Sequence, residues 1–314
     1  MEKIIEIKNL YKTFGEIKAV QDLSFAVRKG EMFAFLGVNG AGKSTTISIL
    51  CGQLKKDSGS VTIAGENIEN GMENISRGLG VVFQDSRLDF PLTVRDNLRS
   101  RAALYGIRGE SFEKRLNELA KLLDFTDLIG RTVGKLSGGQ RRRIDVARAI
   151  IHEPKILVLD EPTTGLDPQT RKLLWSVVEK LRKENGMTVF LTTHYMEEAA
   201  DADYVVIIDA GKIAAEGTPL ELKNKYTGDF VTLYGVTDEE AQSIGMPYEK
   251  IRDAVRLSVP DTLTATKLIV KKPGIFRDYE ITKGKMDDVF LNVTGKALRD
   301  ETERTAEGKR GRVK

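Results

Sequence analysis

A loop that binds phosphate groups is indicated by the run Gly37-Val38-Asn39-Gly40-Ala41-Gly42-Lys43-Ser44-Thr45, which fits the pattern G-x-x-x-x-G-K-[ST]. It follows an apolar segment typical of a buried strand and precedes a helical segment, the context that this pattern requires. Its backbone N–H groups can surround an anion at the helix N-terminus. We expect Lys43 to reach the β- and γ-phosphates and the Ser44 hydroxyl to bind Mg²⁺. The sequence thus predicts nucleotide binding, with a ligand-free glycine turn as the alternative.

Two carboxylates, Asp160 and Glu161, follow an apolar strand at residues 155–159. An acidic pair in this position costs solvation free energy unless it meets a cation or a reacting group. Gln84 ends another apolar strand, where a side chain of an α/β protein points into the ligand crevice. A salt-bridged strand end is the alternative for the carboxylates, and a loop cap is the alternative for Gln84.

A second glycine turn, Ser137-Gly138-Gly139-Gln140, begins a helix at residues 141–151. Ser137 could be a plain N-cap, or the turn could form a second phosphate site at a helix N-terminus. Within the helix, residues 141–143 are arginines that indicate a solvated face. Of the two histidines, His194 ends a strand, and His152 ends this helix, where a charge–dipole interaction would explain it.

The elements that must position these residues follow an α/β order. Strands at residues 4–10 and 23–27 precede the phosphate loop and predict a small antiparallel β-subdomain beside a parallel core. Residues 93–151 have helical character, including an apolar helix face between Phe112 and Leu123. This stretch predicts a helical subdomain inserted in the α/β core.

The pattern changes after Gly217-Thr218-Pro219. Three segments there have β character, and a last helix begins at Asp287; the segments are Phe230–Tyr234, Val255–Val259 and Lys267–Val270. A small α+β appendage is therefore expected. Residues 300–314 lack apolar periodicity and end in basic residues, which predicts a disordered tail.

Composition narrows the class of protein. The 314 residues are 40% hydrophobic and 30% charged, which suits a sizeable core, and the net charge of +3 gives no support for nucleic-acid binding. The single cysteine, Cys51, excludes an internal disulfide and is expected to be a buried apolar residue. No apolar run approaches the roughly 18 residues of a membrane span. A membrane role is therefore expected to come through a partner.

Together these residues resemble an ATP-binding subunit of an ABC transporter. The matching motifs are Walker A at residues 37–45, Q-loop Gln84, signature LSGGQ at residues 136–140, Walker B at residues 156–162, D-loop residues 165–167 and switch histidine His194. Their order and spacing agree from residue 1 to about 218, and LSGGQ is the most specific of them. The phrase Met286-Asp287-Asp288-Val289-Phe290-Leu291 is similar to daunorubicin-resistance-type exporters of drugs or polysaccharides.

The resemblance implies an α/β fold: a P-loop NTPase core with an antiparallel β-subdomain, an inserted helical subdomain and a small C-terminal α+β domain. The expected boundaries are residues 1–218 for the ATP-binding cassette, with its helical subdomain at about 85–155. An accessory α+β domain would occupy residues 219–299, and a tail residues 300–314.

The resemblance also implies a role for each site residue, with ATP and Mg²⁺ as cofactors. The catalytic residues would be Glu161, His194, Lys43 and Gln84. Those that bind the nucleotide would be Phe14, which could stack on adenine, Gly37, Asn39, Gly40, Ala41, Gly42, Lys43, Ser44, Thr45, Ser137, Gly138, Gly139, Gln140 and Asp167. The metal ligands would be Ser44, Gln84 and Asp160.

The implied function is ATP hydrolysis coupled to transport, most consistent with an exporter. Expected partners are an integral membrane permease and a second cassette, giving a homodimer on the cytoplasmic face of the membrane, with no nucleic acid. A non-transport ABC ATPase acting on a ribosome or nucleic-acid complex is the alternative, but such relatives carry paired cassettes or long coiled coils. A binding module without turnover is disfavoured because Glu161 and His194 are both present.

Overall fold

A computed structural model describes residues 2–295 of the chain. It divides into two compact units between Ile213 and Ala214, and each is described by itself. The predicted tail, residues 300–314, lies outside the described residues. Among residues 2–295, no helix combines the length and apolar character that crossing a membrane requires.

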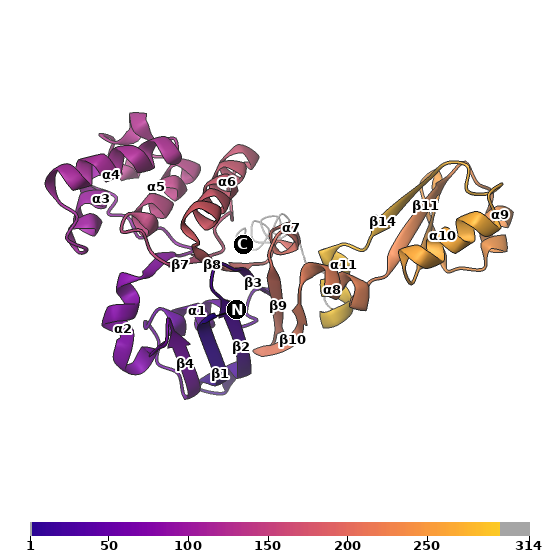
Figure 1. Ribbon diagram of the computed structural model, residues 1–314, viewed down its shortest axis with the longest axis horizontal. Coiled ribbons are helices and arrows are strands. Elements are labelled where there is room, and N and C mark those ends of the chain that lie inside the picture. The colour runs from indigo at the N-terminus through magenta and orange to yellow at the C-terminus, as the bar shows by residue number, and fades with distance from the viewer. Residues whose placement is uncertain (1, 296–314) are drawn as a thin grey trace, which may run out of the picture. The chain divides into compact units, whose positions relative to one another are not determined.

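The first unit is built on a six-stranded sheet (Figure 1). Its strand order is β10 (Lys212–Gly217), β9 (Tyr204–Asp209), β3 (Met32–Leu36), β8 (Thr188–Thr193), β7 (Ile156–Asp160) and β6 (Leu79–Val82). The pairs from β9 to β6 are parallel, and β3, β7 and β8 are buried along their whole length. Because parallel strands end at one edge, the residues that follow β3, β7 and β8 lie together.

A smaller antiparallel sheet stands beside the parallel one, as predicted. Its order is β2 (Ile17–Arg28), β1 (Lys3–Phe14), β4 (Ser58–Ile63) and β5 (Glu66–Asn67). A stack of aromatic rings joins the two sheets, since Phe33 lies 5.2 Å from both Phe25 and Phe190 between ring centroids. Burial of these large side chains stabilises the contact between the layers.

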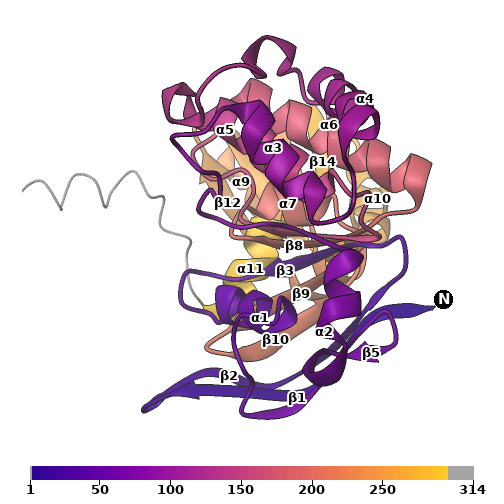
Figure 2. The same cartoon turned by 90° about the vertical axis from the view of Figure 1, so that its left-hand side faces the viewer.

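Four helices cover the parallel sheet: α1 (Lys43–Leu50), α2 (Ile68–Arg77), α6 (Pro168–Asn185) and α7 (Met196–Ala200). In Figure 2, α1 and α2 lie on the side of the antiparallel sheet, and α6 and α7 lie on the other side. Apolar residues of α1 and α2 belong to the same core cluster as those of β1 and β2.

The predicted helical subdomain is present between β6 and β7. It contains α3 (Val94–Ala103), α4 (Gly109–Leu122), the short 3-10 helices at Thr126–Leu128 and Val133–Lys135, and α5 (Gly138–Ile150). The apolar face expected after Phe112 is buried, including Leu116 and Leu119. Ser137 caps α5 because its hydroxyl accepts the Gln140 N–H at 3.2 Å, while the Gln140 side chain returns to the Ser137 N–H at 2.9 Å.

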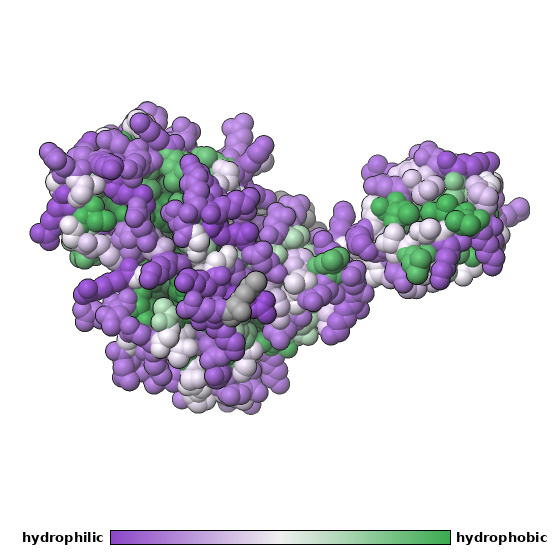
Figure 3. Space-filling model, viewed as in Figure 1, coloured by the Kyte–Doolittle hydropathy of each residue, from purple (hydrophilic) through white to green (hydrophobic). Residues whose placement is uncertain are grey.

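The second unit contains a four-stranded antiparallel sheet in the order β12-β13-β11-β14. Its elements are α8 (Pro219–Tyr226), β11 (Asp229–Tyr234), α9 (Asp238–Ile244), β12 (Tyr248–Ile251), β13 (Ala254–Val259), α10 (Thr262–Lys271), β14 (Tyr279–Lys283) and α11 (Met286–Thr294). From β11 to β14 the order is β-α-β-β-α-β, a split arrangement typical of ferredoxin-like domains. Hydrophobic residues gather on the face of this unit seen in Figure 3.

One expectation for this unit is wrong, because Lys267–Val270 is part of helix α10 and not a strand. The β-branched residues Ile269 and Val270 favoured a strand. However, the side chain of Asp261 accepts the Thr264 N–H at 2.7 Å and starts a helix. Ala265 of this helix is fully buried, so packing decides the conformation.

Candidate active site

The loop between β3 and α1 has the geometry of an anion site. Gly42, the N-cap of α1, has a φ of +108°, and a Cβ atom there would lie 2.4 Å from the carbonyl oxygen of Ala19. Only glycine fits that position. No side chain caps α1, so the N–H groups of its first turn are directed at whatever binds the loop.

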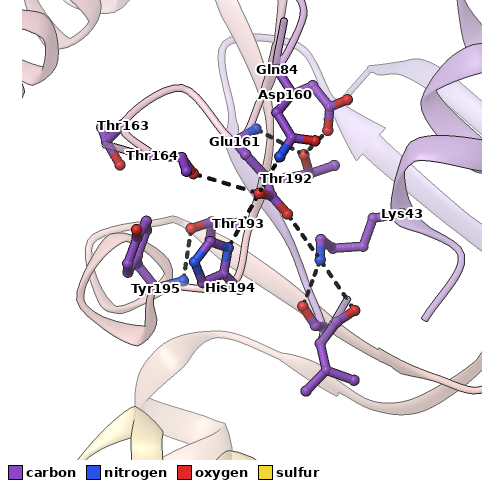
Figure 4. A network of polar contacts seen from close by, with 12 residues as sticks. Lys43, Gln84, Asp160, Glu161, Thr163, Thr164, Thr192, Thr193, His194 and Tyr195 are labelled. Carbon is purple, nitrogen blue, oxygen red and sulfur yellow. Dashed lines mark hydrogen bonds and ion pairs between the residues drawn. The ribbon is translucent and has the colours of Figure 1, made fainter. Parts of the chain in front are cut away.

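Lys43 begins α1 and is only 4% exposed. Its Nζ donates to the carbonyl oxygens of Gly37 at 2.7 Å and Val38 at 3.3 Å, and lies 3.2 Å from Oε1 of Glu161 (Figure 4). Burial lowers the pKa of Lys43, and the Glu161 charge opposes this. A buried ammonium group of this kind is well suited to an anionic ligand.

Glu161 is the centre of the polar network in Figure 4. Its Oε2 accepts from Nε2 of Gln84 at 3.3 Å and lies 3.3 Å from Nδ1 of His194. Burial works against ionisation, but the contacts with His194 and Lys43 outweigh it and lower the pKa of Glu161. The carboxylate is therefore ionised at neutral pH and is held between three polar groups.

The backbone of Glu161 is also unusual, since its φ of +46° lies in the left-handed region. Thr192 of the neighbouring strand holds it there. The Glu161 N–H donates to the carbonyl oxygen of Thr192 at 3.1 Å and to its hydroxyl at 3.2 Å. Such strain persists only where the surroundings fix it, and it clusters at functional sites.

Asp160 lies beside Glu161 and accepts the Thr192 hydroxyl at 2.5 Å. Burial raises the pKa of Asp160, the bond from Thr192 opposes this, and the Glu161 charge adds to the rise. No cluster of three or more His, Cys, Asp or Glu that could hold a metal is found among residues 2–295. A hydroxyl from Ser44, an amide from Gln84 and one carboxylate do fit Mg²⁺, which prefers oxygen ligands and keeps several waters.

Lys43 and Glu161 open onto one hollow of about 710 Å³, whereas Asp160 and His194 lie behind Glu161 and are not part of its lining. Its lining includes the predicted residues Asn39, Gly40, Gly42, Lys43, Ser44, Thr45, Gln84 and Glu161. From β2 it reaches Ile17 and Lys18. Phe14 is 47% exposed at the adjoining hairpin, paired with Ile17, and has Lys12 Nζ at 5.4 Å from its ring centroid. Its contact with adenine stays a prediction.

The signature residues Ser137 to Gln140 do not line this hollow in the same chain. They lie instead beside the D-loop. A Cβ atom on Gly139 would be 2.9 Å from Oγ1 of Thr170 and 3.3 Å from Oδ2 of Asp167. Asp167 caps α6 by accepting the Thr170 N–H at 2.9 Å. The structure therefore groups the predicted residues into two separate sets.

Arg142 is a residue whose role the sequence did not indicate. It is 7% exposed, so the expected solvated face at residues 141–143 is wrong at this position. Its guanidinium donates to five carbonyl oxygens: Pro162 at 2.6 Å, Phe83 at 2.5 Å, Gln84 at 3.4 Å, Asp160 at 3.2 Å and Glu161 at 3.0 Å. The helix that begins with the signature is thereby joined to the backbone of Glu161 and to the residue before Gln84.

The helical spacing of apolar residues after Arg142 could have indicated that this side chain is buried. Val146 and Ala149, four and seven positions later, are buried on the same face of α5. An arginine on an apolar helix face must satisfy its donors inside the protein. Backbone carbonyl oxygens of neighbouring loops supply the acceptors.

Glu198 of α7 is a second such residue. Its buried carboxylate accepts the hydroxyl of Thr163 and, at 2.6 Å, the hydroxyl of Thr193. Burial raises its pKa. Because Thr163 follows Glu161 closely and Thr193 directly precedes His194, Glu198 joins the two segments that carry these side chains.

His152 is not the charged residue that was expected at the end of α5. Its ring stacks on Tyr105 with centroids 3.8 Å apart. Burial, and then the positive charge of Arg101, lower the pKa of His152 to about 4. The ring is therefore neutral at pH 7, and a charge–dipole interaction with α5 does not explain it.

Comparison with known proteins agrees with this geometry. A family model described as ABC transporter matches residues 20–164. Nod factor export ATP-binding protein I of Ralstonia nicotianae is 37% identical, covering 95% of this chain and 95% of its own. Linearmycin resistance ATP-binding protein LnrL of Bacillus subtilis is 33% identical, covering 95% of this chain and all of its own.

Solved structures resemble the chain over its larger part. The dimeric structure of MJ0796, a bacterial ABC transporter cassette, has a TM-score of 0.65 and 29% identity, covering 68% of this chain and 98% of that one. The predicted fold of a P-loop core with added subdomains is thus confirmed. With relatives matched along nearly their whole length, the chain belongs to the ATP-binding subunits of ABC transporters and is an ATPase of an exporter-type system.

Proposed function

We propose that two copies of this chain close around two ATP molecules and that closure drives a separate membrane permease. The observation that carries this proposal is the separation of the two halves of the site. Ser137 and Gly138, at the N-terminus of α5, lie outside the hollow that contains Lys43 and Glu161. A helix N-terminus suited to anions would complete that hollow only when it comes from a second copy.

Within one copy, the phosphate loop and Lys43 bind the triphosphate, and Phe14 stacks on the adenine. The hydroxyl of Ser44, the amide of Gln84 and the carboxylate of Asp160 would hold Mg²⁺, which neutralises charge on the phosphate oxygens. A phosphate beside Lys43 gives its ammonium group a second anionic partner. The ion pair between Lys43 Nζ and Glu161 Oε1, which are 3.2 Å apart, is weakened as a result.

Glu161 orients the water that attacks the γ-phosphate. Its lowered pKa makes it a weak base, so its contribution comes mainly from position. His194, at 3.3 Å from Glu161, steadies that carboxylate and contacts the γ-phosphate. Gln84 donates to the same carboxylate, so the loop after β6 moves or stays according to whether a γ-phosphate is bound beside Glu161.

Closure lasts while the γ-phosphate bridges Lys43 and Ser137 of the partner subunit. Gly138, Gly139 and Gln140 add to that contact, and Asp167 shapes the interface. Hydrolysis and loss of phosphate remove the bridge, so nucleotide chemistry shifts the population between closed and open dimers. The dimer, bound to the permease at the cytoplasmic face of the membrane, passes that shift to the permease.

Glu161→Gln tests the role of the carboxylate. We expect ATP binding to persist and kcat to fall by about a hundredfold or more, the scale of a lost base or positioning group. The variant should also accumulate as a closed dimer in gel filtration with ATP. Full steady-state hydrolysis by this variant would remove Glu161 from its role.

Ser137→Arg tests the shared site. The new side chain is too large for a turn that must approach the γ-phosphate through its backbone N–H groups in the closed dimer. We expect nucleotide affinity of the monomer to change little and ATP-dependent dimerisation to be lost. An unchanged dimer peak with ATP would contradict the two-copy site.

Co-purification tests the transport partner. The full-length chain, tagged and extracted from membranes in mild detergent, should retain an integral membrane protein in stoichiometric amount. Retention of ribosomes or DNA instead would favour a non-transport ATPase.

A further inference from the structure

The imidazole of His194 is fixed by few polar contacts of its own. Its Nδ1 lies 3.3 Å from Oε2 of Glu161 and has no other polar partner among residues 2–295. One contact at the edge of the ring leaves the imidazole free to turn, because rotation about χ2 of histidine has broad, roughly two-fold minima. Another group must therefore set the direction of this ring.

The ring of Tyr195 is placed to do so. It lies beside the imidazole of His194, with centroids 4.1 Å apart and an angle of 38° between the two planes (Figure 4). Contact with an aromatic face restricts the rotation of a neighbouring ring. Within the described residues the Tyr195 hydroxyl forms no hydrogen bond, so this side chain acts through its face and not through its oxygen.

The backbone that carries the two rings is already fixed. The Thr193 hydroxyl accepts the Tyr195 N–H at 2.9 Å and donates to Oε2 of Glu198 at 2.6 Å. Tyr195 is also the N-cap residue of α7. With the backbone held in this way, only the side-chain angles of Tyr195 and His194 remain to be set.

Arg171 of α6 lies over the ring of Tyr195. Its guanidinium carbon is 5.2 Å from the ring centroid. In the described part of the chain Arg171 forms no ion pair, and its buried Nε has no hydrogen-bond partner. A cation that lacks a carboxylate partner is stabilised by an aromatic face, and the ring is held in turn.

Arg171 is anchored to a rigid element. It stands one turn into α6, where its N–H donates to the carbonyl oxygen of Asp167, the N-cap residue, at 3.0 Å. Its charge also reaches Glu198. Burial raises the pKa of Glu198, while the hydrogen bonds from Thr163 and Thr193, and then the Arg171 charge, oppose that rise.

We propose that Tyr195 and Arg171 are positioning residues for His194. Arg171 holds the ring of Tyr195, and that ring keeps Nδ1 of His194 on Glu161, which leaves Nε2 for the γ-phosphate. The inference rests on the proposed role of His194 and deepens it. Neither Tyr195 nor Arg171 lines the nucleotide hollow, so both act through the histidine.

Steady-state hydrolysis by the full-length chain tests the ring contact. Tyr195→Leu removes the aromatic face, so we expect kcat to fall about tenfold or more, as for a displaced catalytic group, with the KM for ATP nearly unchanged. Tyr195→Phe keeps the face and should retain most activity.

The same assay tests Arg171. We expect Arg171→Met to lower kcat about threefold or more, because the ring is then held by a weaker contact. Lys172→Met, an equal loss of charge at the next and exposed position of α6, is the matched control and should leave kcat unchanged.

A double-mutant cycle with His194→Ala excludes a merely structural effect. If Tyr195 acts through His194, Tyr195→Leu should cause no further fall in kcat in the His194→Ala background. A second loss of about tenfold in that background would refute the inference, because the two effects would then be independent.

The histidine rings can also be observed directly by NMR. The chain has only two histidines, so histidine labelled in the ring gives two signals. His194 lies against Tyr195, and His152 is stacked on Tyr105, so Tyr105→Leu identifies the second signal. We expect Arg171→Met to shift the His194 signal and to leave the His152 signal unmoved, whereas Lys172→Met should shift neither.

The outcomes separate this inference from the function on which it rests. Normal kcat for His194→Ala would remove His194 from catalysis and refute both. A fall in kcat for His194→Ala, with normal kcat for Tyr195→Leu and Arg171→Met, would refute the positioning role alone. Arg171 is half-buried, so its kcat and its NMR signal decide the matter even if Tyr195→Leu does not fold.

Discussion

Arg142→Met removes the donors that join three segments of the ATP site, while methionine keeps much of the length of the side chain. The guanidinium now donates to the carbonyl oxygens of Phe83, Gln84, Asp160, Glu161 and Pro162. Hydrogen bonds to charged groups contribute about 1.5–3 kcal/mol each, but they are not additive here because they share one side chain. Each buried carbonyl oxygen left without a donor costs about 1–3 kcal/mol, so with partial relaxation we expect the free energy of unfolding to fall by about 3 kcal/mol or more.

The activity of the variant should change in a specific way. Arg142 touches the backbone of Glu161 but not the phosphate loop, so we expect kcat to fall by about tenfold or more, as for a misplaced catalytic group, with the KM for ATP nearly unchanged. Urea unfolding gives the stability, and steady-state hydrolysis at low temperature gives kcat and KM while the variant is folded. Arg142→Lys should recover only part of the loss, because one ammonium group cannot match the planar fork.

Arg141→Met is the control on the same helix. Its guanidinium lies over the ring of Phe90, at 5.5 Å from the centroid, and is not among the donors to the carbonyl oxygens that Arg142 binds. We expect a loss of at most about 1 kcal/mol and normal kcat. If Arg142→Met matched this control in both stability and kcat, the argument that Arg142 positions Glu161 would be refuted.

Two further predictions concern buried titratable groups. Glu198→Ala leaves the hydroxyls of Thr163 and Thr193 without their acceptor, so we expect kcat to fall about tenfold. Glu198→Gln keeps an acceptor oxygen and should retain most activity. Equal kcat values for wild type and Glu198→Ala would contradict this prediction. The pKa of His152 is about 4 in the folded chain, compared with an ordinary value of 6.5. Between pH 6.5 and pH 4 the unfolded chain therefore binds more protons than the folded chain, and the free energy of unfolding decreases as the pH falls. After a discount for partial exposure, His152→Gln should remove about 2 kcal/mol of that pH dependence in urea titrations from pH 7 to pH 4. Parallel curves for wild type and variant would refute it.

The parts that could be predicted from sequence are those in which local chemistry decides the structure. The loop before Lys43 needs glycine where φ is positive and the backbone of Ala19 is close, so its residue types reveal its geometry. The buried strands β3 and β7 are continuous apolar runs because both faces of the sheet are covered. Glu161 and His194 directly follow buried strands, and parallel strands bring such positions to one edge.

The wrong predictions concern residues whose conformation or burial depends on contacts between segments that are distant in the sequence. Residues 267–270 have the composition of a strand, and only the cap at Asp261 and the burial of Ala265 make them helical. Arg142 stands in a run of arginines, and its acceptors come from residues 83, 84 and 160–162. Neither set of partners can be read from the local pattern.

Polar residues such as Arg142 and Glu198 explain how separate motifs act as one site. The strained backbone at Glu161, with φ +46°, would relax if nothing opposed it. Arg142 binds the carbonyl of Glu161 from α5, and Glu198 binds from α7 the hydroxyl of Thr163, two residues further on. A shift of α5 therefore moves the backbone of Glu161, whose carboxylate orients the water. Apolar packing would hold these loops equally firmly, but hydrogen bonds to particular carbonyl and hydroxyl oxygens also fix their direction, which positioning of a water molecule requires.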